Sequence, residues 1–141
     1  MVGIQHEIPI HSLIFIFITT AADNILLYGG ADLIVYVGHN GLMDFNIKDI
    51  KPHKDNKAKD AIVLACKSKP YFQSTLSKHG CKSVLLTTGF MAPEAYTLKA
   101  SIDGWLSGES GAQIKERAAR AYNKYQKCGL KSSRRLFYSE E

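Results

Sequence analysis

Two side chains that could perform nucleophilic chemistry follow two strand-like apolar runs at corresponding positions. The first run, Ala31 to Val37, stops at Gly38-His39-Asn40-Gly41, and the second, Asp60 to Ala65, stops at Cys66. A thiol attacks as thiolate, and a neighbouring imidazole lowers its pKa or takes its proton. We therefore predict that His39 and Cys66 form a nucleophilic pair suited to acyl transfer.

The two apolar runs predict the elements that would position this pair. Continuous apolar runs bounded by turn residues are typical of strands buried on both faces, and hence of a parallel sheet. Reactive groups of such sheets collect beyond the carboxyl ends of the strands, which lie about 4.7–4.9 Å apart when they are neighbours. A lone cysteine at a strand end is usually a packed core residue. The matched placement of His39 and Cys66 after matched strands favours the nucleophilic interpretation.

Composition indicates one folded domain. The chain has 141 residues, of which 45% are hydrophobic and 22% charged, and these values exclude a disordered chain. The net charge is +5, with lysines and arginines concentrated at 48–59 and 124–135. Such charges most often form a solvated surface, and no aromatic and basic interleaving typical of RNA-binding proteins is present. Nucleic acid therefore stays a minor alternative as a partner.

Cysteine usage and the first thirty residues bear on the compartment. Cys66, Cys81 and Cys128 form no C-x-x-C pair, which excludes zinc ribbons and thioredoxin-like motifs, and no His or Cys pair has zinc-like spacing. We expect reduced thiols, no metal and a cytoplasmic protein, with one disulfide plus a free thiol as the alternative. The apolar run Leu13–Ile18 is too short for a membrane span and lacks a preceding positive charge, so we predict a buried strand there. The stretch 13–22 leaves secretion open.

The remaining patterns alternate between helix and strand. Ile25–Tyr28 has the pattern of a helix end before a glycine stop, and Met43–Lys59 allows at most one helical turn. A helix is predicted over Pro70–His79 and a strand over Ser83–Thr88. Two amphipathic helices follow. The first begins at Pro93 and has an apolar face formed by Ala95, Leu98, Ile102, Trp105 and Leu106. The second begins with a capping box of Ser110 and Gln113, ends at Gly129 and has an apolar stripe formed by Ile114, Ala118, Ala121, Tyr122 and Tyr125. This alternation predicts an α/β sandwich with a largely parallel sheet. Residues 130–141 are expected to form a frayed, basic C-terminal tail.

The residues Tyr36-Val37-Gly38-His39-Asn40-Gly41 followed by Ala61-Ile62-Val63-Leu64-Ala65-Cys66 resemble the His-Gly and Ala-Cys motifs of caspase-like cysteine peptidases. This group includes the caspases, the clostripain and gingipain groups and the bacterial CHAT domains. The order of elements after Cys66 is similar to that of CHAT-type domains. The resemblance covers roughly residues 31–128 and implies a caspase-like core at 31–129, preceded by a divergent or truncated segment at 1–30 that leaves the sheet short.

The resemblance also implies a mechanism. His39 and Cys66 would be the catalytic dyad of a peptidase that cleaves a peptide or protein substrate without metal or organic cofactor. In the family a glycine directly follows the histidine, whereas here Asn40 intervenes, so the oxyanion donors would be the N–H groups of Cys66 and of Asn40 or Gly41.

Two further readings stay open at this stage. The turn with Thr88 and Gly89 lies at the same predicted sheet edge, where it either lines the substrate site or is a plain strand-to-helix turn. The alternative to an active peptidase is a catalytically silent α/β module that binds a ligand or partner. Oligomeric state is left open by the sequence.

Charge near the predicted dyad bears on specificity. Lys67 and Lys69 follow the cysteine, and Asp44 is the nearest carboxylate to the histidine in the sequence. A peptidase that cleaves after basic residues needs an acidic group in its site. We expect either a preference for acidic substrates or no basic preference.

Overall fold

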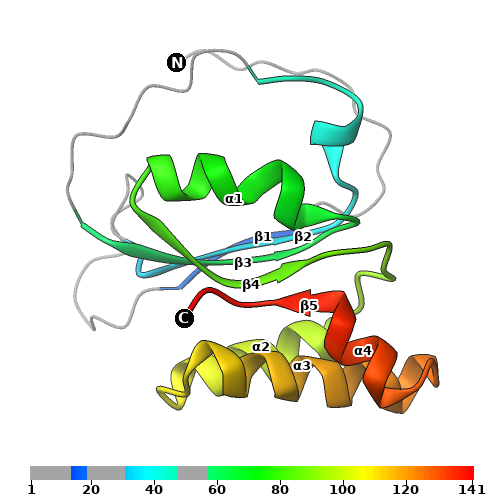
Figure 1. The fold of residues 1–141 in the computed structure, drawn as a ribbon. Helices are drawn as coiled ribbons and strands as arrows, with labels where there is room; N and C mark the ends of the chain where they lie inside the picture. Colours follow the sequence, from blue (N-terminus) through cyan, green and yellow to red (C-terminus); the bar gives the residue numbers. More distant parts are fainter. Residues whose placement is uncertain (1–13, 19–30, 48–56) are drawn as a thin grey trace.

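A mostly parallel β-sheet forms the centre of the protein in a computed structural model, which describes residues 14–18, 31–47 and 57–141 (Figure 1). Its strand order is β1-β2-β3-β4-β5. The bounds are β1 Ile14–Ile18, β2 Leu33–Val37, β3 Lys59–Leu64, β4 Cys81–Thr87 and β5 Phe137–Tyr138. The three central strands are parallel, and the edge strands β1 and β5 pair antiparallel with β2 and β4.

Helices cover both faces of the sheet, which gives the three layers visible in Figure 1. Helix α1 (Ser68–Lys78) lies on one face, and α2 (Ala95–Leu106), α3 (Gly111–Gln126) and α4 (Leu130–Leu136) lie on the other. A single 3-10 turn, η1 (Gly41–Met43), follows β2. The prediction of an α/β fold with helices around a mostly parallel sheet is confirmed.

The two faces of the strands bury side chains in two separate cores. Leu33, Val35 and Val37 of β2 contribute to a large core under α2 and α3, together with Ile62 and Leu64 of β3. The opposite core, under α1, is smaller and is built on Val63, Ala65 and Leu86, against which Tyr36, Phe72 and Leu76 pack. This burial on both faces explains why the strands read as continuous apolar runs.

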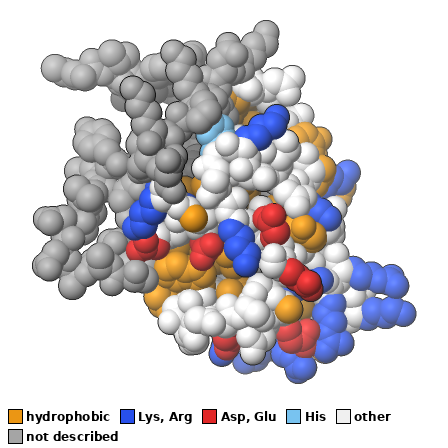
Figure 2. Space-filling model, turned by 60° about the vertical axis from the view of Figure 1, so that its left-hand side comes forward, with side chains coloured by type: hydrophobic (Ala, Val, Ile, Leu, Met, Phe, Trp, Pro, Cys, Tyr) orange, Lys and Arg blue, Asp and Glu red, His pale blue; other side chains and the backbone are white. Residues whose placement is uncertain are grey.

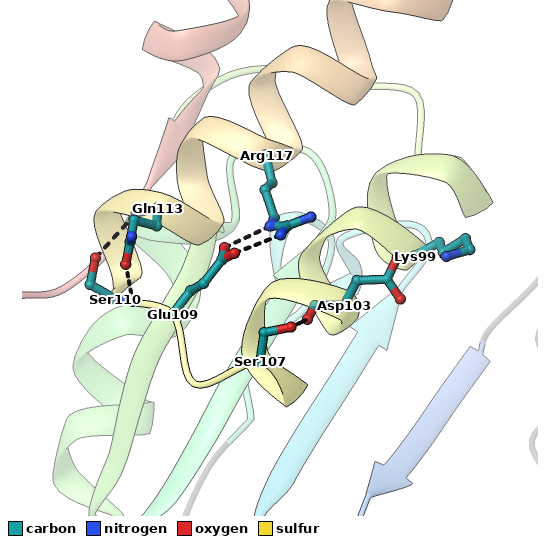
Figure 3. Close-up of polar contacts among 7 residues, drawn as sticks. All are labelled: Lys99, Asp103, Ser107, Glu109, Ser110, Gln113 and Arg117. Atoms are coloured by element: carbon teal, nitrogen blue, oxygen red, sulfur yellow. Dashed lines mark hydrogen bonds and ion pairs between the residues drawn. The ribbon is translucent and has the colours of Figure 1, made fainter.

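Helices α2 and α3 approach each other closely at Gly104. A Cβ atom there would lie 2.9 Å from Oε2 of Glu109 and 3.1 Å from Cγ1 of Ile114, so a larger residue would force the helices apart. Figure 3 shows Glu109 and Arg117 pointing toward each other, with two nitrogen–oxygen distances of 2.6 Å. The predicted capping box of Ser110 and Gln113 is present at the start of α3.

The C-terminal residues are ordered, so the prediction of a frayed tail over 130–141 is wrong. Leu130–Leu136 form α4, and Phe137, only 1% exposed, lies in the large core and contacts the ring of Tyr122 edge to face. The segment carries enough apolar surface to be held against the sheet, despite its basic residues. Its bonds include one from the N–H of Thr88 to the carbonyl of Leu136 at 2.8 Å.

Other predictions have mixed outcomes. The predicted N-terminal strand is present as β1, although the burial of its side chains is not described. The predicted helix end at Ile25–Tyr28 and most of the crossover after Met43 lie outside the described residues. Leu106 and Tyr125, assigned to apolar helix faces, are 60% and 55% exposed. Leu106 is the last residue of its helix, and the ring of Tyr125 stacks on Tyr96 at the surface.

The surface carries charges of both signs. On the side shown in Figure 2, basic and acidic side chains are interspersed, and lysine and arginine side chains extend at the lower right. None of the helices in the described part of the chain has the length and apolar character needed to cross a membrane.

Candidate functional site

Cys66 lies in a tight strand-to-helix turn between β3 and α1. Lys67, the next residue, adopts a left-handed backbone conformation with φ of 50° and serves as the N-cap of α1. A non-glycine residue at positive φ is uncommon and persists only where the surrounding structure enforces it. The thiol of Cys66 is partly exposed beyond the end of β3.

Buried hydroxyl groups hold this turn against β4. The Oγ atom of Ser68 is 2.8 Å from the carbonyl oxygen of Val63, 2.8 Å from the backbone nitrogen of Thr87 and 3.0 Å from the Oγ1 atom of Thr87. The Thr87 hydroxyl also donates to the carbonyl of Ala65. Both hydroxyl residues are 0% exposed, so these bonds are shielded from water. The network fixes the backbone on both sides of Cys66.

The loop after β4 provides a second attachment for the turn. The N–H of Lys67 donates to the carbonyl of Gly89 at 2.8 Å, and the Cys66 thiol donates to the carbonyl of Met91 with a sulfur–oxygen distance of 3.5 Å. Thr88 directly follows β4, and its hydroxyl donates to the carbonyl of Arg135 at 2.7 Å. Thr88 and Gly89 therefore lie at the same sheet edge as Cys66, and both already make contacts within the protein.

Asn40 provides a third attachment, through its side chain. Its Nδ2 atom donates to the carbonyl of Cys66 at 2.7 Å, and its Oδ1 atom accepts from the N–H of Leu42 at 3.1 Å. The side chain is 0% exposed. Sequence reasoning assigned only the backbone of Asn40 to the site and missed this link, which joins the histidine turn to the cysteine turn. The signal available in the sequence was the polar Asn40 directly after His39.

His39 follows β2 as Cys66 follows β3. The last paired residues of these strands are Val37 and Leu64, so each candidate residue lies two positions beyond a matched pair. The two residues thus lie at the same edge of adjacent parallel strands. Within the described residues, however, no hydrogen bond joins the His39 imidazole to the Cys66 thiol; the imidazole bonds Asp44 and the thiol bonds the Met91 carbonyl.

The imidazole of His39 is paired with a carboxylate. Its Nε2 atom is 2.5 Å from Oδ2 of Asp44, and the two side chains are 59% and 64% exposed. A carboxylate accepts hydrogen bonds, so Nε2 carries the proton and, in the neutral ring, Nδ1 holds the lone pair. Asp44 therefore orients the ring and leaves Nδ1 as the atom able to accept a proton. The sequence pointed to Asp44 only as a specificity residue.

Among the predicted oxyanion donors, the backbone N–H groups of Cys66 and Asn40 have no hydrogen-bond partner in the described part of the chain. The N–H of Gly41 donates to the carbonyl of His39 at 3.1 Å and is already engaged. Of the three predicted oxyanion donors, the partly exposed Cys66 has its N–H available for a developing negative charge, whereas Asn40 is 0% exposed.

No metal site is evident around these residues. Among residues 14–18, 31–47 and 57–141, no group of three or more His, Cys, Asp or Glu side chains could hold a metal ion. The chemistry that the arrangement permits is proton transfer to an imidazole and attack by a thiolate, neither of which needs a metal. Comparison with protein-family models, with curated proteins and with solved structures finds no match to this chain.

Proposed function

We propose that the protein is a cysteine-dependent acyl-transfer hydrolase, a caspase-like peptidase in which Cys66 is the nucleophile and His39 the base. One observation carries the proposal: both residues lie two positions beyond the paired strand ends Val37 and Leu64. The turn around Cys66 is also fixed by bonds from Ser68, Thr87 and Asn40. Catalytic constellations need this kind of rigid support.

The first half of the reaction forms a thioester. The Cys66 thiol leaves its bond to the Met91 carbonyl and transfers its proton to Nδ1 of His39, while Nε2 stays bound to Asp44. The thiolate then attacks a peptide carbonyl carbon, and the N–H group of Cys66 holds the oxyanion. The imidazolium returns the proton to the amine as the carbon–nitrogen bond breaks. Water, deprotonated by His39, then hydrolyses the thioester and frees the thiol.

The exposure of His39 favours the approach of its ring to Cys66. The imidazole is largely exposed, and its carboxylate partner is exposed too, so rotation of this pair displaces little packing. Catalytic hydrogen bonds are often long in the absence of substrate and tighten when substrate binds. The mobile partner would thus be the base, and the fixed partner the nucleophile.

A second candidate function is that of a catalytically silent α/β binding module. It is favoured by the Cys66 thiol, which donates to the Met91 carbonyl rather than to an imidazole. In that case Cys66 would be a packed residue of the strand-to-helix turn and His39 a surface residue.

Alkylation by iodoacetamide near neutral pH tests the proposal, because the chain contains its own reference thiols. Cys128 is exposed, and Cys81 is buried, where desolvation raises the pKa of its thiol. An activated Cys66 reacts faster than Cys128 even though it is less exposed, and His39→Ala slows Cys66 without affecting Cys128. Mass spectrometry of tryptic peptides measures all three rates.

Two outcomes decide between the candidate functions. Faster labelling of Cys66 together with peptide hydrolysis that is lost in Cys66→Ser, at near-native thermal stability, supports the peptidase. Labelling of Cys66 that is slower than that of Cys128 and unchanged by His39→Ala would contradict it and favour the silent module.

A further inference from the structure

Exposed apolar side chains concentrate around the proposed site. Of the seven large hydrophobic side chains that are exposed in the described part of the chain, four lie in the two segments next to His39 and Cys66: Met43, Phe45, Ile47 and Phe90. Exposed apolar residues that occur singly need no explanation, but a cluster beside a polar site is typical of a binding surface.

Phe45 and Ile47 lie on the histidine side. Phe45 is 56% exposed, and its ring rests against Gly41, since a Cβ there would be 2.9 Å from the Phe45 Cε1 atom. Its N–H donates to the carbonyl of Gly41 at 3.1 Å, which fixes the backbone of this residue beside the histidine turn. Ile47, two residues on, is 55% exposed. The histidine side therefore presents fixed apolar surface to solvent.

Phe90 lies on the cysteine side. It is 67% exposed, and both of its neighbours in the chain contact the Cys66 turn, Gly89 through the N–H of Lys67 and Met91 through the thiol. The Phe90 ring has the Lys67 ammonium 4.5 Å from its centroid. Burial does not account for an aromatic residue held at this position, because most of its surface faces water.

The charges at the site disfavour a basic substrate. The carboxylate of Asp44 is bound to His39, and the Lys67 ammonium over Phe90 adds a positive charge on the cysteine side. A cationic side chain would meet repulsion without an acidic partner. Apolar side chains can instead cover the exposed surface of Phe45 and Phe90 without needing a charged partner.

We propose that the site binds peptide segments that carry bulky apolar side chains on both sides of the bond presented to Cys66, with Phe45 and Ile47 contacting one side chain and Phe90 the other. This inference rests on the proposed function for the position of the bond. The preference itself comes from the exposed apolar surface and is independent of thiol chemistry. It can therefore be measured as binding without turnover.

The test uses the full-length Cys66→Ser protein and two fluorescein-labelled, end-blocked hexapeptides. Their central residues are Phe-Leu in one and Ala-Ala in the other. We expect fluorescence polarisation to give a dissociation constant at least tenfold lower for the Phe-Leu peptide, because two large side chains lose contact with water. Phe45→Ala and Phe90→Ala should each weaken its binding about tenfold.

Leu106→Ala is the matched control. Leu106 is 60% exposed, and it follows Trp105, whose indole nitrogen donates to Asp60 near the start of β3, at the opposite edge of the sheet. This variant should bind the Phe-Leu peptide as tightly as the parent. Thermal melts show whether Phe45→Ala is folded. Ile47→Ser is a second variant on the histidine side, so it tests the same contact if Phe45→Ala misfolds.

Three outcomes would overturn the inference. They are equal binding of the two peptides, unchanged binding by both phenylalanine variants, and sedimentation that shows a dimer dissociated by Phe90→Ala, because the apolar surface would then bind a second copy of the chain. Slow, His39-independent alkylation of Cys66 would instead contradict the proposed function and leave the peptide preference standing.

Discussion

The two turns that carry the candidate residues are held in opposite ways. The turn of Cys66 is attached by buried hydroxyl groups, by the loop after β4 and by the Asn40 amide, whereas the imidazole of His39 is held by one exposed carboxylate. A left-handed residue follows the cysteine, and a short 3-10 turn follows the histidine. Neighbouring strands of one sheet thus lead to a cysteine in a turn held by buried bonds and to a histidine whose ring is held by one exposed partner.

This difference teaches how the site divides its tasks. A nucleophile has to hold its position relative to the oxyanion donors, and that requires buried bonds which cannot exchange with water. A base has to approach, accept a proton and release it, which an exposed pair can do with little change in packing. Variants on the two sides should therefore separate stability from activity.

The largest effect is expected from Ser68→Ala. Its hydroxyl bonds the Val63 carbonyl and the Thr87 N–H, both in buried surroundings, and alanine leaves these groups unsatisfied. The free energy of unfolding should fall by about 2–3 kcal/mol, since each unsatisfied buried group costs about 1–3 kcal/mol. Urea unfolding measures the loss. Ser77→Ala, at an exposed position of α1, is the control; equal losses in both variants would show that the network contributes nothing.

Asn40→Ala should have the next largest effect. Removal of the buried amide leaves the Cys66 carbonyl without this donor and the Leu42 N–H without its acceptor. We expect a loss of about 1–2 kcal/mol of stability together with slower alkylation of Cys66. Asn46→Ala, at an exposed position of the same loop, should change neither quantity. Native stability in Asn40→Ala would mean that the two turns are not coupled.

Asp44→Ala should change stability by less than about 0.5 kcal/mol, because ion pairs as exposed as that of His39 and Asp44 contribute little. The imidazole loses the group that orients it, so the rate of Cys66 alkylation or of peptide cleavage should fall about tenfold or more. Asp103→Ala removes the comparably exposed pair with Lys99 on α2 and is the control. Unchanged rates would exclude Asp44 from the site.

The smallest expected effect is a pH dependence of the ion pair between Glu116 and Arg134, which lies outside the Cys66 turn. The hydrogen bond from Arg134 lowers the pKa of Glu116 from 4.5 to about 2, and this ion pair links α3 to α4. A lowered folded-state pKa contributes stability above pH 4.5 that is lost as the pH falls toward about 2. Amide chemical shifts of α4 and of Thr88 should change over that interval. Glu116→Gln should abolish this pH dependence; its persistence would assign the change to other groups.

Much of the fold could be predicted from local pattern. Apolar runs defined β2 and β3, Gly80 with its φ of 71° ended α1 as expected, and the capping box at Ser110 began α3. These features depend on residues close in sequence, whose physics is local. The position of His39 and Cys66 at the same edge of the sheet also followed, because parallel strands bring their carboxyl ends to one edge.

The contacts that complete the site could not be predicted in this way. The Asn40 amide bonds a carbonyl 26 residues away, and the Ser68 and Thr87 hydroxyls meet across 19 residues. Such pairs have no period in the sequence. The order of the C-terminus did have a signal, because Leu130, Ser133, Leu136 and Phe137 repeat at helical spacing, but the surrounding basic residues masked it.

The residues from Phe137 to Glu140 cover the outer edge of β4. β5 pairs with Leu86 and Thr87, and Glu140 exchanges bonds with Ser83 through its backbone N–H and its carboxylate. Without them β4 would offer a row of unpaired backbone groups along Val84 to Thr87, a template on which another chain could add a strand. A shortened chain that ends near Gly129 is therefore expected to form intermolecular sheets. A loss of activity in such a variant would then arise from self-association and not from the loss of a catalytic group.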